Sequence, residues 1–316
     1  MRSLLKPALL FVAVGLAIYA GLYYAAERLM MRTGHANPLF KIATAREGDV
    51  DWVILGASHA MTLDFADFNA RMERDTGLRI LNLAGPGTGP LYNRFVLEHL
   101  LGRRRTRNVL YVVDGFAFYS RAWNEERFAD AKLLRRTPSE PAIAARLWDY
   151  ARREGVDPRA VLDYVSGFSK INNRERFKRD VWEGEAQFER EVRRSATALK
   201  KRVAYLYPDA ASEAALSRYL EELAAIAALA RRSGARLVVV KMPVPAQFLG
   251  QLPGEAAFDA ALSRLLSAQQ VCFADFSAAL EAPRFYFDTD HLNRTGLTEF
   301  VNAGLKPILL SRDCAP

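Results

Sequence analysis

Residues 51–59 read DWVILGASH, and this stretch decides the fold. Asp51–Leu55 is a short, mainly apolar run that predicts a buried strand, and Gly56 marks its end. Ser58 follows almost at once. In a parallel α/β sheet the ligand binds at the carboxyl ends of the strands, so the sequence predicts that Ser58 lies at such an edge.

The rest of the chain alternates between strands and helices. The predicted strands are Asp51–Leu55, Leu78–Leu83, Asn108–Val113, Arg236–Lys241 and Val271–Asp275. The predicted helices are Leu91–Leu101, Glu213–Arg232, Ala257–Ala268 and Thr295–Leu310. This alternation predicts an α/β fold in which helices cover both faces of a parallel sheet.

A second motif, Asp288-Thr-Asp-His291, stands near the C-terminus. A serine hydroxyl is a poor nucleophile until a base accepts its proton, and His291 can do so if an anion fixes its other ring nitrogen. Asp288 is well placed for this role, because Asp-x-x-His can fold both side chains to the same side. Asp290 is the rival, but side chains of adjacent residues tend to diverge. We therefore predict Ser58 as nucleophile, His291 as base and Asp288 as its orienting partner.

These motifs resemble those of the SGNH (GDSL-like) hydrolase superfamily, particularly its membrane-anchored bacterial members that handle O-acyl groups on envelope glycans. The resemblance covers roughly residues 50–120 and 235–310. It implies a flavodoxin-like three-layer sandwich with Ser58, Asp288 and His291 as the catalytic residues. The family's third block, Gly-x-Asn-Asp, is missing here. The corresponding strand end reads Val112-Val-Asp-Gly-Phe116, without the Asn that completes the family's oxyanion hole.

Other candidate site residues follow the second and third predicted strands. The resemblance implies that Gly87, with Gly85 as second choice, donates its N–H to the oxyanion hole, beside the N–H of Ser58. Asn82 and Asp114 are candidates for positioning substrate. His59 is interpreted either as part of the turn or as a substrate contact, and not as the base, because nothing local would orient it.

The N-terminus carries a predicted membrane anchor. Residues 7–26 contain no charge, and twenty residues at about 1.5 Å each cover roughly 30 Å, the thickness of a bilayer's hydrocarbon core. Tyr19, Tyr23 and Tyr24 gather at one end, as in an aromatic belt. A cleaved signal peptide has a shorter apolar core, of about 7–15 residues, and no clean Ala-x-Ala site closes this run. We expect an uncleaved anchor in residues 1–32 and an SGNH-like catalytic domain in residues 33–316.

The orientation follows from the position of this segment. The basic residues that flank it differ little in number, but a first span so close to the N-terminus usually behaves as a signal anchor. We therefore expect a single-pass protein of the inner (cytoplasmic) membrane whose catalytic domain is periplasmic. Cys272 and Cys314 permit a disulfide in that compartment, and Cys272 equally suits a core position.

Residues 121–205 depart from the alternation. They combine tryptophans and many charges with helical patterning that prolines interrupt, which predicts a mainly helical insertion. One interpretation is a solvated helical surface. The other is a cap over the active site, or a surface that faces anionic lipid or a partner protein.

Composition and motifs exclude several other classes. Lys and Arg number 44 against 36 Asp and Glu, a net charge of +8, which suits anionic lipids or acidic glycans. No RNA-binding, zinc-finger or helix-turn-helix signature accompanies the charge, so we expect no nucleic-acid partner. The four histidines are scattered along the sequence, which argues against a metal hydrolase, and no cofactor motif is present. An α/β-hydrolase elbow would need Gly where Ala60 stands.

The sequence thus predicts a serine-dependent enzyme that transfers or hydrolyses an O-acyl group, most simply acetyl, on a cell-envelope polysaccharide. Its expected partners are an acyl-ester or glycan substrate and the membrane. The resemblance adds a multi-pass membrane acyltransferase that supplies the acyl group. The alternative is a non-catalytic accessory or glycan-binding subunit of an envelope-modifying complex, which the missing Asn favours.

Overall fold

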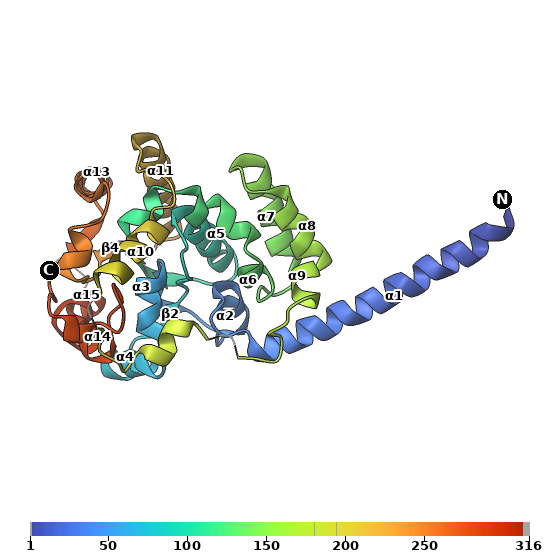
Figure 1. Cartoon of the computed structure of the whole chain (residues 1–316), viewed down its shortest axis with the longest axis horizontal. Coiled ribbons are helices and arrows are strands. Elements are labelled where there is room, and N and C mark those ends of the chain that lie inside the picture. The colour runs from blue at the N-terminus through green and yellow to red at the C-terminus, as the bar shows by residue number, and fades with distance from the viewer. Residues whose placement is uncertain (1, 180, 194, 312–316) are drawn as a thin grey trace. The chain divides into compact units, whose positions relative to one another are not determined.

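The computed structural model of the chain describes residues 2–179, 181–193 and 195–311 (Figure 1). It comprises two compact units. Residues 1–43 and 128–180 form the anchor unit, which contains the long apolar helix at the N-terminus. Residues 44–127 and 181–316 form the sheet unit.

The sheet unit is built on five parallel strands: β1 (Val50–Leu55), β2 (Ile80–Asn82), β3 (Thr106–Val112), β4 (Arg236–Lys241) and β5 (Cys272–Asp275). They lie in the order β2-β1-β3-β4-β5, and each neighbouring pair is parallel. This is the flavodoxin-like strand order. The predicted fold class is confirmed, and the strand boundaries agree with the predicted ones to within about two residues.

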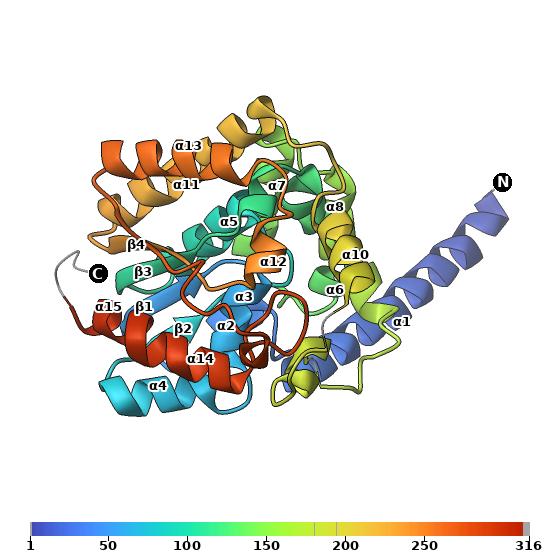
Figure 2. The ribbon, with the colours of Figure 1, turned by 60° about the vertical axis from the view of Figure 1, so that its left-hand side comes forward.

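Helices cover both faces of the sheet, which gives three layers (Figure 2). One layer contains α5 (Pro90–Leu101), α11 (Glu213–Arg232) and α13 (Glu255–Ala268), and the other contains α4 (Phe68–Thr76), α14 (Arg294–Phe300) and α15 (Lys306–Leu310). The sheet unit also contains shorter helical pieces: α3 (Ser58–Met61), α10 (Ala196–Leu206), α12 (Ala246–Leu249), η1 (Thr62–Asp64), η2 (Gly115–Phe118), η3 (Arg121–Trp123), η5 (Glu183–Gln187) and η6 (Pro283–Phe285). One more 3-10 helix, η4 (Glu125–Ala129), begins in the sheet unit and ends in the anchor unit. Buried β-branched and aliphatic residues of the central strands form the core between the layers.

The last helix differs from its prediction. The predicted helix Thr295–Leu310 is interrupted by one π-helical turn, η7 (Val301–Leu305), between α14 and α15. Pro307 explains the interruption, because it has no N–H to donate and its ring displaces the carbonyl one turn earlier. The end of α15 is tied to the sheet by Trp52, whose indole N–H donates to the carbonyl of Leu309 at 3.1 Å.

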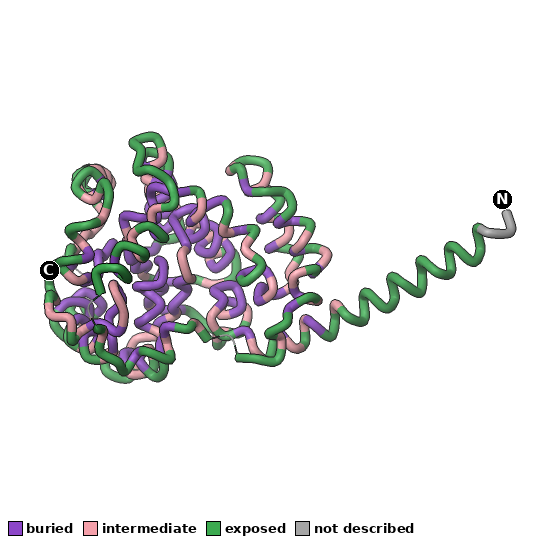
Figure 3. Tube along the Cα trace, viewed as in Figure 1, coloured by how far each residue is buried: buried purple, intermediate pink, exposed green. Residues whose placement is uncertain are grey.

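The anchor unit contains α1 (Arg2–Thr33), α2 (Pro38–Thr44), α6 (Ala131–Leu134), α7 (Pro141–Arg153), α8 (Pro158–Ser166) and α9 (Phe168–Ile171), although the last residue of α2 lies in the sheet unit. In α1 the stretch Leu5–Thr33 is long and apolar enough to cross a membrane. Most of α1 is exposed, and burial begins near Ala26 (Figure 3). The helix therefore extends beyond the predicted uncharged span, residues 7–26, and its last residues pack against the rest of the anchor unit.

The region predicted as one insertion, residues 121–205, divides between the two units. Residues 128–180 belong with α1, whereas 181–205 belong with the sheet. The second part is held there by Phe188, which lies in the core, and by Val192, whose N–H donates to the carbonyl of Tyr286 at 2.8 Å. Of the two cysteines, Cys272 begins β5, and Cys314 lies outside the described residues.

Candidate active site

Gly56 sets the position of Ser58. Its φ of +142° is a conformation that side chains rarely permit, and a Cβ at this position would lie 2.7 Å from the carbonyl oxygen of Val112. The chain therefore turns sharply out of β1, and Ser58 becomes the first residue of α3. Asn93 fixes the turn by accepting a hydrogen bond from the N–H of Gly56 at 3.0 Å. Ser58 is 5% exposed.

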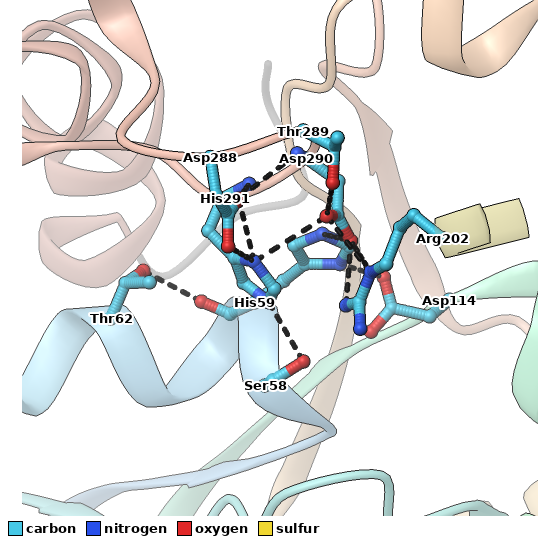
Figure 4. Close-up of polar contacts among 9 residues, drawn as sticks. All are labelled: Ser58, His59, Thr62, Asp114, Arg202, Asp288, Thr289, Asp290 and His291. Atoms are coloured by element: carbon cyan, nitrogen blue, oxygen red, sulfur yellow. Dashed lines mark hydrogen bonds and ion pairs between the residues drawn. The ribbon is translucent and has the colours of Figure 1, made fainter. Parts of the chain in front are cut away.

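His291 and Asp288 meet Ser58 from the other end of the chain (Figure 4). Nε2 of His291 lies 2.9 Å from the Ser58 hydroxyl oxygen, and Nδ1 lies 2.9 Å from Oδ2 of Asp288. Ser58, His291 and Asp288 have the geometry of a catalytic triad. The backbone N–H of His291 also donates to Asp288, at 2.8 Å, which folds the two side chains of the triad to the same side of the loop.

The loop that carries Asp288 and His291 is held at both ends. The N–H of Phe287 donates to the carbonyl of His291 at 3.0 Å, and Tyr286 forms an isolated antiparallel bridge with Leu292. Next, the side chain of Asn293 accepts from the N–H of Gly296 at 2.9 Å and so caps α14. The histidine therefore stands on a braced turn directly before a helix.

Aromatic rings surround the imidazole of the triad. Phe287 stacks on His291 with ring centres 5.6 Å apart and planes 11° apart, and Trp182 meets the same imidazole edge-on at 5.0 Å. His291 is only 1% exposed. This enclosure keeps the base away from bulk water and restricts its rotation.

His59 lies beside the triad and contacts two carboxylates. Its Nδ1 is 2.6 Å from Oδ1 of Asp114, its Nε2 is 3.3 Å from Oδ2 of Asp290, and its ring centre is 4.7 Å from that of His291. Burial alone lowers the pKa of this imidazole, but the charge and hydrogen bond of Asp114, together with those of Asp290, raise the pKa to about 10. His59 is thus a buried cation at neutral pH.

Asp290 is completely buried and is held by Arg202 of α10. The guanidinium donates from Nε to both carboxylate oxygens at 3.0 Å, and from Nη2 to Oδ2 at 2.8 Å. Burial raises the pKa of Asp290, but the charge that His291 carries when protonated, the charge of Arg202 and the hydrogen bond from His59 hold it well below its usual range. For Asp288, too, the opposing effect of burial is outweighed by the charge and hydrogen bond of His291, which lower its pKa.

The charges of the site are close to balance. Three carboxylates, those of Asp114, Asp288 and Asp290, face two cations, those of His59 and Arg202. One further positive charge on His291 completes the balance. A histidine that accepts a proton from Ser58 acquires that charge at a place prepared for it.

The remaining predicted site residues are held in different ways. Asn82 uses its amide to brace the turn: Nδ2 donates to the carbonyl of Ala60 at 2.7 Å, and Oδ1 accepts from Ala84 at 3.0 Å. The N–H of Gly85 donates to the carbonyl of Gly56 at 3.3 Å. Asp114, predicted as a substrate contact, is bonded to His59.

Gly87 has a left-handed φ of +61°, and the ring of Trp123 lies so close that a Cβ would meet it at 2.7 Å. A side chain at this position would therefore displace Trp123. Of the two glycines predicted for the oxyanion hole, Gly85 already donates its N–H to the carbonyl of Gly56 within the turn.

Two of the histidines that are scattered along the sequence, His59 and His291, lie together in the fold. Ligating atoms of His59, Asp290 and His291 lie within 4.8 Å of one another, because the fold joins segments more than 200 residues apart. The set nevertheless fits a metal poorly. A metal needs a neutral imidazole, whereas the pKa of His59 is about 10, and Asp290 already receives the guanidinium of Arg202.

Two contributors to the site, Arg202 and Trp182, carry no sequence signal. Both lie in the segment whose pattern is irregular, and each acts on a residue of the distant Asp288–His291 loop. His59 did carry a signal, since a histidine directly after the predicted nucleophile is poised to enter the site. What the sequence does not reveal is its pair of carboxylate partners.

A cavity of about 860 Å³ in the sheet unit opens beside Asp288 and Thr289. Its walls combine apolar with polar side chains, among them Val192, Leu199, Phe248, Arg193, Gln247 and Gln251. The volume is typical of a site for a small organic ligand. The cavity adjoins the triad at Asp288, and neither Ser58 nor His291 is among its lining residues.

Comparisons with known proteins find relatives only among solved structures. No protein-family model and no curated protein matches the chain. Similar structures include a protein from Bacteroides fragilis described as an acylhydrolase (9% identity, 86% of this chain and 93% of that one, TM-score 0.46). A second is a GDSL-like lipase from Bacteroides thetaiotaomicron (9% identity, 85% of this chain and 93% of that one, TM-score 0.45). A third is TesA (13% identity, 82% of this chain and 99% of that one, TM-score 0.38).

One of these structures is described as GDSL-like, the class that the motifs resemble. Identities of 9–13% and TM-scores below 0.5 do not indicate which reaction this protein catalyses. The assignment of the site rests on the distances among Ser58, His291 and Asp288.

Proposed function

We propose that this protein is a serine-dependent enzyme that transfers or hydrolyses an O-acyl group, most simply acetyl, on a cell-envelope polysaccharide. The observation that carries the proposal is the unbroken line from the hydroxyl of Ser58 through the ring of His291 to the carboxylate of Asp288, with 2.9 Å at each step. Hydrogen-bond distances at both steps are what a nucleophile, its base and an orienting group require.

In the first half of the reaction, Ser58 attacks the carbonyl carbon of the acyl ester while His291 takes the hydroxyl proton. The bond to the leaving alcohol then breaks as His291 returns this proton to the alcohol oxygen, and the acyl group stays on Ser58. Asp288 accepts from Nδ1–H and stabilises the imidazolium. The N–H groups of Ser58 and Gly87 are the proposed donors to the oxyanion, since the N–H of Gly85 is engaged.

In the second half, an acceptor hydroxyl attacks the acyl-enzyme. His291 takes the acceptor's proton and passes it to Ser58 as the serine ester bond breaks. If the acceptor is water, the protein is an esterase, and if it is a sugar hydroxyl, it is an O-acyltransferase. The rings of Trp182 and Phe287 around His291 favour transfer, because they limit the access of water to the base.

The proposed cellular setting combines the apolar helix with the site. The stretch Leu5–Thr33 would anchor the chain in the inner membrane, with the sheet unit and the rest of the anchor unit on the periplasmic side. A glycan substrate is supported by the size and mixed lining of the cavity beside Asp288. A multi-pass membrane acyltransferase is the proposed source of the acyl group.

The test uses the full-length chain in detergent, a fluorophosphonate probe and a chromogenic acetyl ester. We expect labelling and turnover in the wild type, and the loss of both in Ser58→Ala and His291→Ala, with turnover reduced by about 10³-fold or more. Ser311→Ala, a change at the end of the described chain, is the matched control and should label normally. Absence of labelling in folded wild-type protein would refute an enzyme that acts alone.

A second candidate is a non-catalytic accessory or glycan-binding subunit. It is favoured by the segment that follows β3, which lacks the superfamily's Asn and in which Asp114 is bonded to His59. This candidate predicts binding of an acetylated envelope glycan that Ser58→Ala does not impair, and no labelling at Ser58.

A further inference from the structure

Helix α8 of the anchor unit buries one face and exposes apolar side chains on another. Ala160, Val161 and Tyr164 are buried. Leu162 and Val165, one turn apart, are 70% and 60% exposed, and Phe168 at the start of α9 is 61% exposed. Three large apolar side chains grouped on one short stretch indicate an interaction surface. We call Leu162, Val165 and Phe168 the apolar row.

The apolar row lies on the segment that borders the apolar part of α1. The hydroxyl of Tyr19 donates to the carbonyl of Ser166 at 3.0 Å. The ring of Tyr23 packs so closely on Gly167 that a Cβ there would lie 2.1 Å from it. Thus two tyrosines of α1 contact the junction between α8 and α9, which Figure 1 shows beside that helix.

A buried ion pair fixes this arrangement. Lys170 of α9, 4% exposed at its side chain, bonds Glu27 of α1, and its ammonium also donates to the Ser139 hydroxyl at 3.0 Å. Burial lowers the pKa of Lys170, opposed by the charge of Glu27. Because a buried ion is strongly destabilising without its partner, the pair holds α9 at one level along α1.

That level coincides with one end of the apolar stretch. Tyr19 and Tyr23 belong to the group of tyrosines at the outer end of the uncharged residues 7–26, where an aromatic belt meets the lipid headgroups. Side chains next to Ser166 and Gly167 are therefore at the depth of the interface. Amphipathic helices bind there with their apolar face about 5–10 Å deep.

We propose that the apolar row of α8 and α9 inserts into the outer interfacial layer of the bilayer, beside the membrane-spanning part of α1. The bilayer is the occupant because the row continues the exposed apolar surface of α1, on which Leu16 is 64% and Leu22 is 52% exposed. The anchor unit then has two attachments to the membrane, a span and an interfacial helix. Two attachments restrict its tilt and rotation, which a single helix does not.

The experiment places the photo-cross-linker p-benzoyl-phenylalanine at Phe168 of the full-length chain in native membranes, followed by irradiation and intact-mass analysis. The matched control is the same replacement at Phe177, which is 75% exposed in the same unit. Its neighbour Arg176 contacts Thr33, fourteen residues and roughly 20 Å along α1 from Tyr19. A replacement at Leu16 is the positive control for contact with lipid.

We expect adducts with the mass of a phospholipid at Leu16 and at Phe168, and at least about fivefold fewer at Phe177, because only the first two sites reach acyl chains. An adduct of Phe168 with another protein, or with a second copy of this chain, overturns the proposal. So does equal lipid labelling at Phe168 and Phe177, or lipid labelling at Leu16 alone. The outcome does not depend on the chemistry of Ser58.

Discussion

Arg202 donates three hydrogen bonds to the carboxylate of Asp290, a side chain that is completely buried beside the triad. The pair joins α10 to the Asp288–His291 loop across 88 residues of sequence. Asp290 in turn contacts His59 at 3.3 Å and lies 3.5 Å from Nδ1 of His291. Arg202 therefore stabilises the negative charge of Asp290, and that carboxylate in turn contacts the imidazoles of His59 and His291.

Arg202→Met should destabilise the protein and reduce its turnover. Removal of one partner leaves the buried carboxylate of Asp290 unpaired, which costs about 3 kcal/mol of unfolding free energy. Arg202→Lys should recover only part of this, because an ammonium cannot form the paired hydrogen bonds of a guanidinium. Denaturant unfolding measures the first effect and acetyl-ester hydrolysis the second.

The matched control is Arg153→Met, which removes an exposed i,i+4 pair with Asp149. Exposed pairs contribute little, so its unfolding free energy should stay close to that of the wild type. Equal losses in the two methionine variants would contradict a special role for Arg202.

Asp288 and Asp290 should differ in what their amide variants lose. Asp288→Asn should lower kcat by about 10²–10⁴-fold with a small change in stability, because Asp288 fixes the tautomer of His291. Asp290→Asn should chiefly lower the unfolding free energy, since it leaves Arg202 and His59 facing an uncharged amide. Turnover and denaturant unfolding of both variants separate the two roles. The reverse pattern would make Asp290 the orienting residue.

His59 should make folding stability depend on pH above neutrality. Its pKa is raised from 6.5 to about 10, so its contribution is complete below about pH 6.5 and is lost as pH rises towards 10. The unfolding free energy should therefore fall by up to about 1.4 kcal/mol per pH unit between pH 7 and 9 from this group. In His59→Gln this decline should be much smaller, although the variant is less stable at pH 7. His35→Gln, at an exposed histidine, is the control and should decline like the wild type.

The sequence predicts those parts of the structure that depend on local pattern. Apolar runs locate all five strands of the sheet, and Gly56 and Ser58 fall where the first strand ends. The Asp288–His291 motif is also local, because the N–H of His291 bonds to Asp288 within the same turn. Such features need no knowledge of distant segments.

The parts that the sequence does not predict depend on long-range contacts. Nothing near His59 in sequence orients it. Its partners come from distant segments, since Asp114 follows β3 and Asp290 lies in the loop before α14. Arg202 and Trp182 lie in a segment whose pattern gives no hint of the triad. The division of residues 121–205 between two units follows from burial of Phe188 in the core, which a charged, proline-interrupted sequence hides.

Gly56→Ala should damage both folding and the position of Ser58. The native φ is +142°, and the new Cβ would lie 2.7 Å from the backbone oxygen of Val112, which cannot move without disturbing the sheet. We expect a loss of more than about 2 kcal/mol and reduced fluorophosphonate labelling. Gly77→Ala is the matched control. It also has a positive φ, of +69°, but its Cβ would meet nothing within 4 Å, so about 1 kcal/mol and normal labelling are expected.

Trp182→Ala should change the acceptor that the acyl-enzyme prefers. The indole meets the imidazole of His291 at 5.0 Å, where it limits the approach of water to the base. Its removal should raise hydrolysis relative to transfer by a few-fold, while Trp182→Phe keeps an aromatic ring and should preserve most of the wild-type ratio. The measurement supplies an acetyl ester with a sugar acceptor and quantifies free acetate against acetylated sugar. If the alanine variant loses both products equally, Trp182 only supports the fold of its segment. If the ratio shifts towards acetate, the ring of Trp182 helps this site to select a sugar hydroxyl over water as the acceptor.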